Sequence, residues 1–82
     1  MTRQKRSLTL HGHRTSVALE PEFWAVIDRA VKDEDLSFAA LITRIDDERV
    51  MARHRHGLAS YLRVWALTRV QSGLPGNSKP RE

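Results

Sequence analysis

The chain has 82 residues, a net charge of +4, and 29% charged against 40% hydrophobic residues. This size and composition indicate one small folded domain with a marginal core, which oligomerisation often completes. The absence of cysteine excludes disulfides, thiolate zinc sites and cysteine nucleophiles. No apolar run is long enough to span a bilayer and no signal-peptide core follows the N-terminus, so we expect a cytoplasmic protein without membrane contact.

The charge is distributed unevenly along the chain. Residues 1–19 carry four basic and no acidic residues, and residues 20–48 carry nine acidic against three basic ones. Residues 49–82 carry seven basic residues against one acidic residue. Such segregation is typical of a protein whose partner is an acidic polymer, most often nucleic acid.

The first 13 residues are polar and basic, with Leu8 and Leu10 alternating with polar residues. Two interpretations stay open: a basic arm that becomes ordered on contact, or a weak extension of the next strand, interrupted at Gly12. Residues 14–19 are the clear strand candidate, because apolar and small or polar side chains alternate there. One face holds Thr15, Val17 and Leu19, and the other holds Arg14, Ser16 and Ala18.

Three amphipathic helices are predicted after the strand, from proline at a first turn, a serine N-cap and apolar residues at helical spacing. They span Pro21 to Asp33 or Glu34, Phe38 to between Glu48 and Met51, and Leu58 or Ala59 to about Gln71. Val64 and Leu67 broaden the apolar surface of the third helix, so we expect both its flanks to pack. The predicted organisation is a basic arm at 1–13, a domain at 14–71 and a disordered tail at 72–82.

A single strand leaves backbone N–H and C=O groups unpaired and cannot close a core alone. Antiparallel pairing with the same strand of a second copy satisfies both needs and gives a two-fold ribbon in a homodimer. Such a ribbon fits the major groove of double-stranded DNA. On its outer face, Arg14 suits guanine acceptors, Ser16 can donate or accept, and Ala18 suits a thymine methyl group.

Residues from about Lys5 to Gln71 resemble a ribbon-helix-helix domain of the MetJ/Arc type. The similarity rests on Lys5-Arg6-Ser7, on Gly12-His13-Arg14-Thr15-Ser16 and on the Phe23-Trp24 helix start, as in a branch of small bacterial proteins. It implies a mainly α fold with one N-terminal β-strand, an intertwined homodimer with a two-stranded antiparallel ribbon, and an extra C-terminal helix. The implied function is transcriptional regulation.

The resemblance assigns base contacts to Arg14, Ser16 and Ala18, and phosphate contacts to the backbone N–H groups of Ser37 and Phe38. Basic charge adds further candidate phosphate contacts. They are Arg3, Lys5 and Arg6 in the arm, and Arg53 and Arg55 in the connector before the third helix.

Two residues depart from the family pattern. Ala18 lacks the polar group often found at the third base-contacting position, and Asp35 stands where a glycine usually precedes the second helix. A rival register therefore stays open, in which Gly57-Leu58-Ala59-Ser60, behind Arg53 and Arg55, begins the second helix. We favour the start at Ser37, because it leaves the normal length for the first helix and turn.

Other side-chain groups predict no chemistry. Two histidines at His11-x-His13 or at His54-x-His56 lack further ligands, so no metal site is expected. Asp46-Asp47-Glu48 fits a solvated helix end. Trp24 and Trp65 fit a core or a dimer interface better than base stacking. Without a nucleophile, phosphate loop or acid/base pair, we expect a protein that is not an enzyme and uses no cofactor.

Two other functions compete with the transcriptional regulator. One is an antitoxin-type interaction module that holds a partner protein through the third helix and the tail. The other is an architectural DNA binder with little sequence preference.

Overall fold

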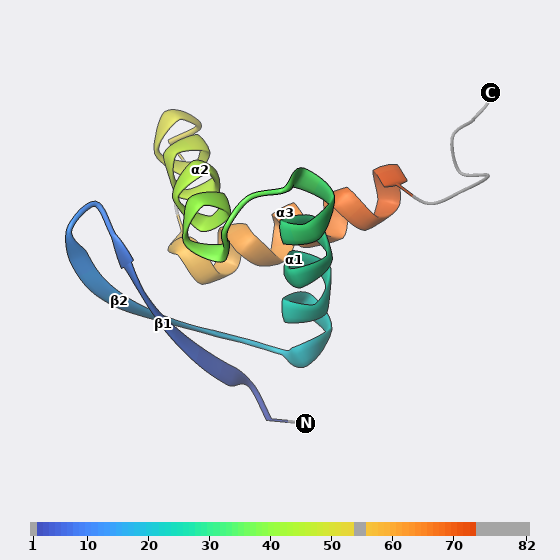
Figure 1. Ribbon diagram of the computed structural model, residues 1–82, viewed down its shortest axis with the longest axis horizontal. Coiled ribbons are helices and arrows are strands. Elements are labelled where there is room, and N and C mark those ends of the chain that lie inside the picture. The colour runs from blue at the N-terminus through green and yellow to red at the C-terminus, as the bar shows by residue number, and fades with distance from the viewer. Residues whose placement is uncertain (1, 54–55, 74–82) are drawn as a thin grey trace.

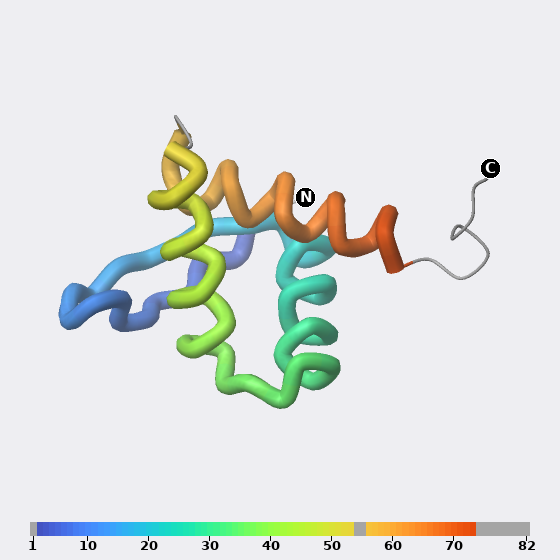
Figure 2. The backbone as a smooth tube through the Cα atoms, turned by 90° about the horizontal axis from the view of Figure 1, so that it is seen from above, coloured from blue at the N-terminus to red at the C-terminus, as the bar shows by residue number. Residues whose placement is uncertain are grey.

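A computed structural model describes residues 2–53 and 56–73 of the chain. The elements in order are β1 Gln4–Leu10, β2 His13–Leu19, α1 Pro21–Glu34, α2 Phe38–Met51 and α3 Leu58–Gly73. The two strands form an antiparallel ribbon on one side of the helices (Figure 1). In Figure 2, α1 and α2 run side by side and α3 crosses the N-terminal end of α1 and the C-terminal end of α2.

The ribbon is a hairpin made by one chain. β1 pairs with β2 from Gln4 opposite Leu19 to Leu10 opposite His13. The two residues between them, His11 and Gly12, have φ angles of 52° and 83°. Positive φ at both positions gives the tight turn whose twist matches that of the strands. Gly12 therefore reverses the chain, whereas the sequence pattern predicts only an interruption of a strand there.

This hairpin corrects two expectations. The fold has two N-terminal strands instead of one, and residues 4–10 are a strand rather than an arm. The inference that β2 finds a partner only in a second copy is wrong, because β1 of the same chain supplies one. The predicted division of β2 into two faces is confirmed. Leu8, Leu10, Val17 and Leu19 are buried on the inner face, and Arg14 and Ser16 are exposed on the outer face.

The three helices complete a core against the inner face of the ribbon. Trp24 is the largest buried side chain, and its indole Nε1 donates a hydrogen bond to the carbonyl of Gln4 at 2.7 Å. This bond satisfies the one polar atom that burying a tryptophan brings into the core. The other buried apolar side chains of the helices are Ile27 and Ala30 of α1, Leu41, Ile42 and Ile45 of α2, and Leu62 and Ala66 of α3. Trp65 is half-buried beside this cluster.

The turn between α1 and α2 decides where the second helix begins. Asp35 is left-handed, with φ 55°, and its N–H donates to the carbonyl of Lys32 at 3.2 Å. Ser37 then caps α2, its Oγ accepting the N–H of Ala40 at 3.1 Å. The start at Ser37 is confirmed and the rival start near Ala59 is wrong. The positive φ at position 35 explains why the family usually has glycine there, because glycine adopts positive φ without strain.

The third helix differs from its prediction in two ways. α3 ends at Gly73 instead of Gln71, while residues 74–82 of the expected tail lie outside the described residues. Val64 and Leu67, which we expected to pack, are each 53% exposed. In the part of the chain that the structure describes, no helix is long and apolar enough to cross a membrane.

Replacing Asp35 with glycine should raise the free energy of unfolding by about 0.5–1 kcal/mol, because the left-handed backbone is strained for a side-chain-bearing residue. Asp35→Val should lower it by about 1–2 kcal/mol, since a β-branched residue tolerates positive φ worst. Urea denaturation measures both. Equal losses in the two variants would show that strain at this turn is unimportant.

Candidate nucleic-acid interface

The outer face of the hairpin brings the predicted base-contacting residues together. Arg14 and Ser16 are exposed and Ala18 is half-buried, all on the same side of β2. Opposite them on β1 lies a second outward row, in which Thr9 faces Arg14, Ser7 faces Ser16 and Lys5 faces Ala18. The sequence did not indicate that this row of β1 lies on the same face as the predicted base-contacting residues of β2.

The centre of this face is polar and its two ends are basic. The hydroxyl oxygens of Ser7 and Ser16 lie 3.2 Å apart across the strands. Lys5 and Arg14 form no ion pair with any described residue, and neither strand contains an acidic residue. Their charges are therefore available to an anionic partner.

Arg6 lies on the opposite, inner face because side chains alternate along a strand. Its Nη1 and Nη2 donate to the two carboxylate oxygens of Asp28 at 2.8 and 2.9 Å. The guanidinium carbon also lies 4.5 Å from the ring centroid of Trp24 and 5.3 Å from that of Phe38. The hydrogen bond from Arg6 lowers the pKa of Asp28, and the same bond raises the pKa of Arg6. Arg6 thus ties β1 to α1 and α2, and is engaged there instead of facing a phosphate.

The start of α2 presents a positive helix end without an acidic residue in its first turn. The first backbone N–H groups of a helix lack intrahelical acceptors. Ser37 is exposed, and its side chain accepts the hydrogen bond of the Ala40 N–H. The backbone N–H groups before Ala40 therefore remain as donors for an anion. Asp35 is exposed nearby in sequence and carries the only charge of this short turn.

The remaining residues predicted to contact phosphate lie on different parts of the chain. Arg3 is exposed directly before β1, and Arg53 is exposed just after α2, with φ 54°. Arg55 lies outside the described residues. The structure therefore groups Arg3 and Lys5 with the ribbon and leaves Arg53 on a different element.

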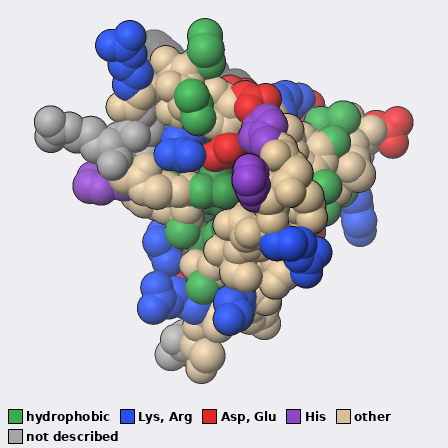
Figure 3. Space-filling view, turned by 90° about the vertical axis from the view of Figure 1, so that its left-hand side faces the viewer, with side chains coloured by type: hydrophobic (Ala, Val, Ile, Leu, Met, Phe, Trp, Pro, Cys, Tyr) green, Lys and Arg blue, Asp and Glu red, His purple; other side chains and the backbone are tan. Residues whose placement is uncertain are grey.

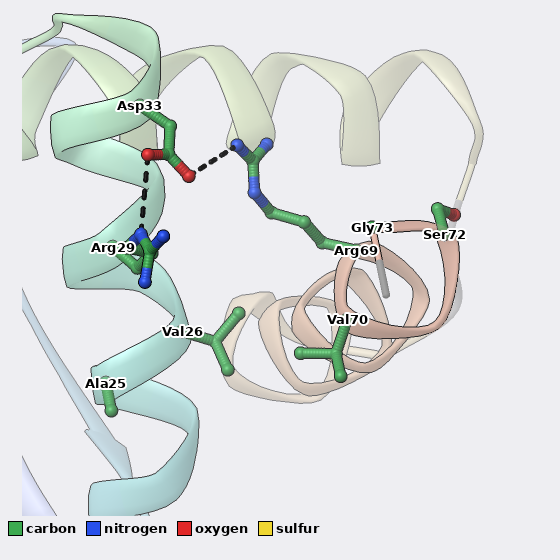
Figure 4. Close-up of a pocket in the computed structure, with 8 residues that line it drawn as sticks. All are labelled: Ala25, Val26, Arg29, Asp33, Arg69, Val70, Ser72 and Gly73. Atoms are coloured by element: carbon green, nitrogen blue, oxygen red, sulfur yellow. Dashed lines mark hydrogen bonds and ion pairs between the residues drawn. The ribbon is translucent and has the colours of Figure 1, made fainter. Parts of the chain in front are cut away.

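A groove between α1 and the C-terminal half of α3 is the other notable surface feature (Figure 4). Its volume is about 680 Å³, and Val26 and Val70 form part of its apolar lining. Asp33 accepts a hydrogen bond from Arg29 Nε at 3.4 Å and lies 3.7 Å from Arg69 Nη2. The cations of the groove are thus paired within the protein, unlike those of the outer ribbon face.

One further cluster escaped the sequence interpretation. Asp46, expected at a solvated helix end, is only 8% exposed, and it lies with Asp47 beside His11 at the tip of the hairpin. The burial results from packing of α2 against β1, a contact between segments far apart in the sequence.

Residues 3–70 match a family model described as a ribbon-helix-helix domain. The chain belongs to the ribbon-helix-helix family. The match extends over β1, β2 and all but the last turn of α3. The hairpin and the third helix are therefore part of the matched domain.

A solved structure supports this assignment. An uncharacterized protein from Bordetella pertussis Tohama I is 31% identical and superimposes with a TM-score of 0.72. The similarity covers 96% of this chain and 67% of that one. No curated protein matches the chain.

Arg6→Ala should lower the free energy of unfolding by about 1–2 kcal/mol, because it removes a partly exposed ion pair and a cation–π contact together. Lys5→Ala, one residue away on the outer face, is the matched control and should change stability by less than about 0.5 kcal/mol. Urea denaturation at neutral pH compares the two. Similar losses would contradict the role assigned to Arg6.

The ion pair between Arg6 and Asp28 also predicts that the free energy of unfolding depends on pH. The pKa of Asp28 is lowered in the folded state, so its contribution is complete above the unfolded pKa and is lost as pH falls through the folded value. The stability difference between the native chain and Asp28→Asn should therefore be constant near neutrality and shrink below about pH 4. A difference that persists unchanged in acid would exclude this linkage.

Proposed function

We propose that this chain is a homodimeric, sequence-specific DNA-binding transcriptional regulator of the bacterial cytoplasm. Membership of the ribbon-helix-helix family makes DNA binding and regulation plausible. The observation that carries the proposal is the outer ribbon face, on which Arg14, Ser16 and Ala18 share one side with Lys5 and no carboxylate. A two-stranded ribbon is one of the elements that the major groove admits.

In this proposal, Arg14 provides the strongest base contact, because its guanidinium matches the two acceptors of guanine in the major groove. Ser16 contacts base edges as donor or acceptor, and its neighbour Ser7 fixes its hydroxyl from across the ribbon at 3.2 Å. Ala18 contributes only apolar contact with a thymine methyl group. Sequence preference should therefore depend mainly on Arg14.

Phosphate contacts fix the orientation of the ribbon in the groove. The backbone N–H groups at Ser37 and Phe38 bind one phosphate through the positive end of α2. Arg3, Lys5, Arg53 and Arg55 add salt-sensitive attraction. Arg6 contributes indirectly, by holding the inner face of the ribbon on α1 and α2.

The second copy pairs with the open edge of β2. In a hairpin with a two-residue turn, the residues flanking the turn exchange backbone hydrogen bonds, and bonded and non-bonded pairs then alternate. The backbone groups of Arg14, Ser16 and Ala18 therefore point to the open edge. Antiparallel pairing about Ser16 satisfies them and places Arg14 of each copy opposite Ala18 of the other, which keeps the cations apart. The dimer then contains a four-stranded sheet in the order β1-β2-β2-β1, and its two central β2 strands face the groove.

Replacing Arg14 with alanine should weaken binding to a selected operator by about 1–3 kcal/mol and relax its sequence preference. Lys5→Ala should weaken binding to all duplexes alike and reduce the slope of affinity against salt by about 1. Mobility shifts on selected and random duplexes distinguish the two effects. An unchanged preference in Arg14→Ala would remove its base-contacting role.

The dimer is tested by proline on the two open edges of the hairpin. Ser16→Pro should give a monomer in light scattering at micromolar concentration, because its ring blocks the β2 edge without removing a bond of the hairpin. Ser7→Pro makes the equivalent change on β1 and should remain a dimer. A native chain that is monomeric at that concentration, or two variants of equal mass, would contradict this pairing.

One observation favours an alternative, the antitoxin-type interaction module. Val64 and Leu67 are 53% exposed and Val70 is 38% exposed on α3, so the third helix offers apolar surface to a partner protein. A toxin-like reading frame next to the gene, and its product copurifying with the native chain but not with Leu67→Asp, would support it. Equal competition by random duplex would instead indicate an architectural DNA binder.

A further inference from the structure

The tip of the hairpin meets the middle of α2 at a small polar cluster. His11 Nε2 lies 3.0 Å from Asp47 Oδ1 and 4.0 Å from Asp46 Oδ2. One ligand-type atom from each of these three residues lies within 4.8 Å of the others. Figure 3 looks onto this side of the molecule and shows histidine side chains gathered against acidic ones.

Asp46 is the unusual member of the cluster, because its acidic side chain is only 12% exposed. Its Oδ1 accepts a hydrogen bond from Arg49 Nε at 3.0 Å. Its Oδ2 faces His11, and no described residue places a donor within hydrogen-bond distance of it. Among the described residues, Oδ2 thus has only the 4.0 Å contact with His11, which leaves its lone pairs available to a cation.

The turn conformation is compatible with histidine, which is one of the side chains that tolerate positive φ. His11 occupies the first position of a two-residue turn at φ 52°, where asparagine or aspartate before glycine is the favoured choice. On α2, successive side chains such as Asp46 and Asp47 normally diverge. Both nevertheless reach His11, because the hairpin tip lies over the helix. The two carboxylates therefore converge on the side chain at the hairpin tip.

We propose that His11, Asp46 and Asp47 form a binding site for a divalent transition-metal ion of the zinc type. An imidazole nitrogen with two carboxylate oxygens is a ligand set that Zn²⁺ accepts, whereas Mg²⁺ and Ca²⁺ prefer oxygen ligands alone. Bonds of about 2.0–2.2 Å in a tetrahedral site place ligand atoms about 3.3–3.5 Å apart. The separations of 3.0 Å from His11 to Asp47 and 4.0 Å from His11 to Asp46 lie on either side of that spacing.

Arg49 has the supporting role. By donating to Asp46 Oδ1 it fixes the orientation of this carboxylate and leaves Oδ2 for the ion. The fourth position of the ion is open to water on the exposed side, where His11 and Asp47 lie. Binding would join the hairpin turn to a helix 36 residues away in the sequence. The site is independent of the proposed DNA contacts, since it uses none of their residues.

Isothermal titration of Zn²⁺ into the full chain tests the proposal. The native chain should show one saturable site, and His11→Asn and Asp47→Asn should each weaken affinity by about tenfold or more. Asparagine is favoured at the turn position of His11, so His11→Asn keeps the hairpin while removing the imidazole. His13→Asn is the matched control on the same hairpin and should retain native affinity.

Thermal unfolding followed by circular dichroism gives a second measurement. Zn²⁺ should raise the unfolding midpoint of the native chain and of His13→Asn but not of His11→Asn, and Mg²⁺ at the same concentration should raise none of them. The proposal is overturned if the native chain does not bind Zn²⁺, because the cluster is then an ion pair alone. An equal loss of affinity in His13→Asn also overturns it, by showing non-specific histidine binding.

Discussion

The Arg6 guanidinium is the contact on which the orientation of the ribbon depends. It forms two hydrogen bonds with Asp28 of α1 and lies against the rings of Trp24 and Phe38, and so joins β1 to both of the first two helices. Because side chains alternate along a strand, holding Arg6 inward turns Lys5 and Ser7 outward. A slip of one residue would exchange the two faces of the strand. The same contact therefore favours the register that the two-residue turn sets, and it exposes the polar face of the hairpin.

Internal pairing of the acidic middle segment leaves the ribbon with the free positive charge. Arg63 donates to Glu20 at 2.9 Å, and Arg69 donates to Glu34 at 3.0 Å. These bonds are the main cause of the lowered pKa values of both carboxyl groups. Two bases of α3 are thus paired with Glu20, which directly precedes α1, and with Glu34, the last residue of α1. On the hairpin, by contrast, Lys5 and Arg14 make no ion pair with a described residue.

Local patterns predicted the helices well, because capping residues and apolar spacing act within a few positions of each other. The bounds of α1 and the start of α2 at Ser37 follow from Pro21 and from the serine cap. The sequence left residues 1–13 open between an arm and a strand extension, because the turn is His11-Gly12 instead of the more recognisable Asn-Gly. Charge alone suggested a phosphate contact for Arg6, but its strand position turns it inward. The burial of Asp46 depends on a hairpin tip far away in the sequence and had no local signal.

The alternation of inward and outward side chains along β1 and β2 has a consequence for how such a protein can diverge in sequence. Residues that shape the core, such as Leu8 and Val17, and residues that face outward, such as Ser7 and Ser16, occupy interleaved positions on the same strands. Substitution of an outward residue removes no core contact. After a gene duplication, the encoded protein can therefore change its outer ribbon face one residue at a time while keeping the same fold.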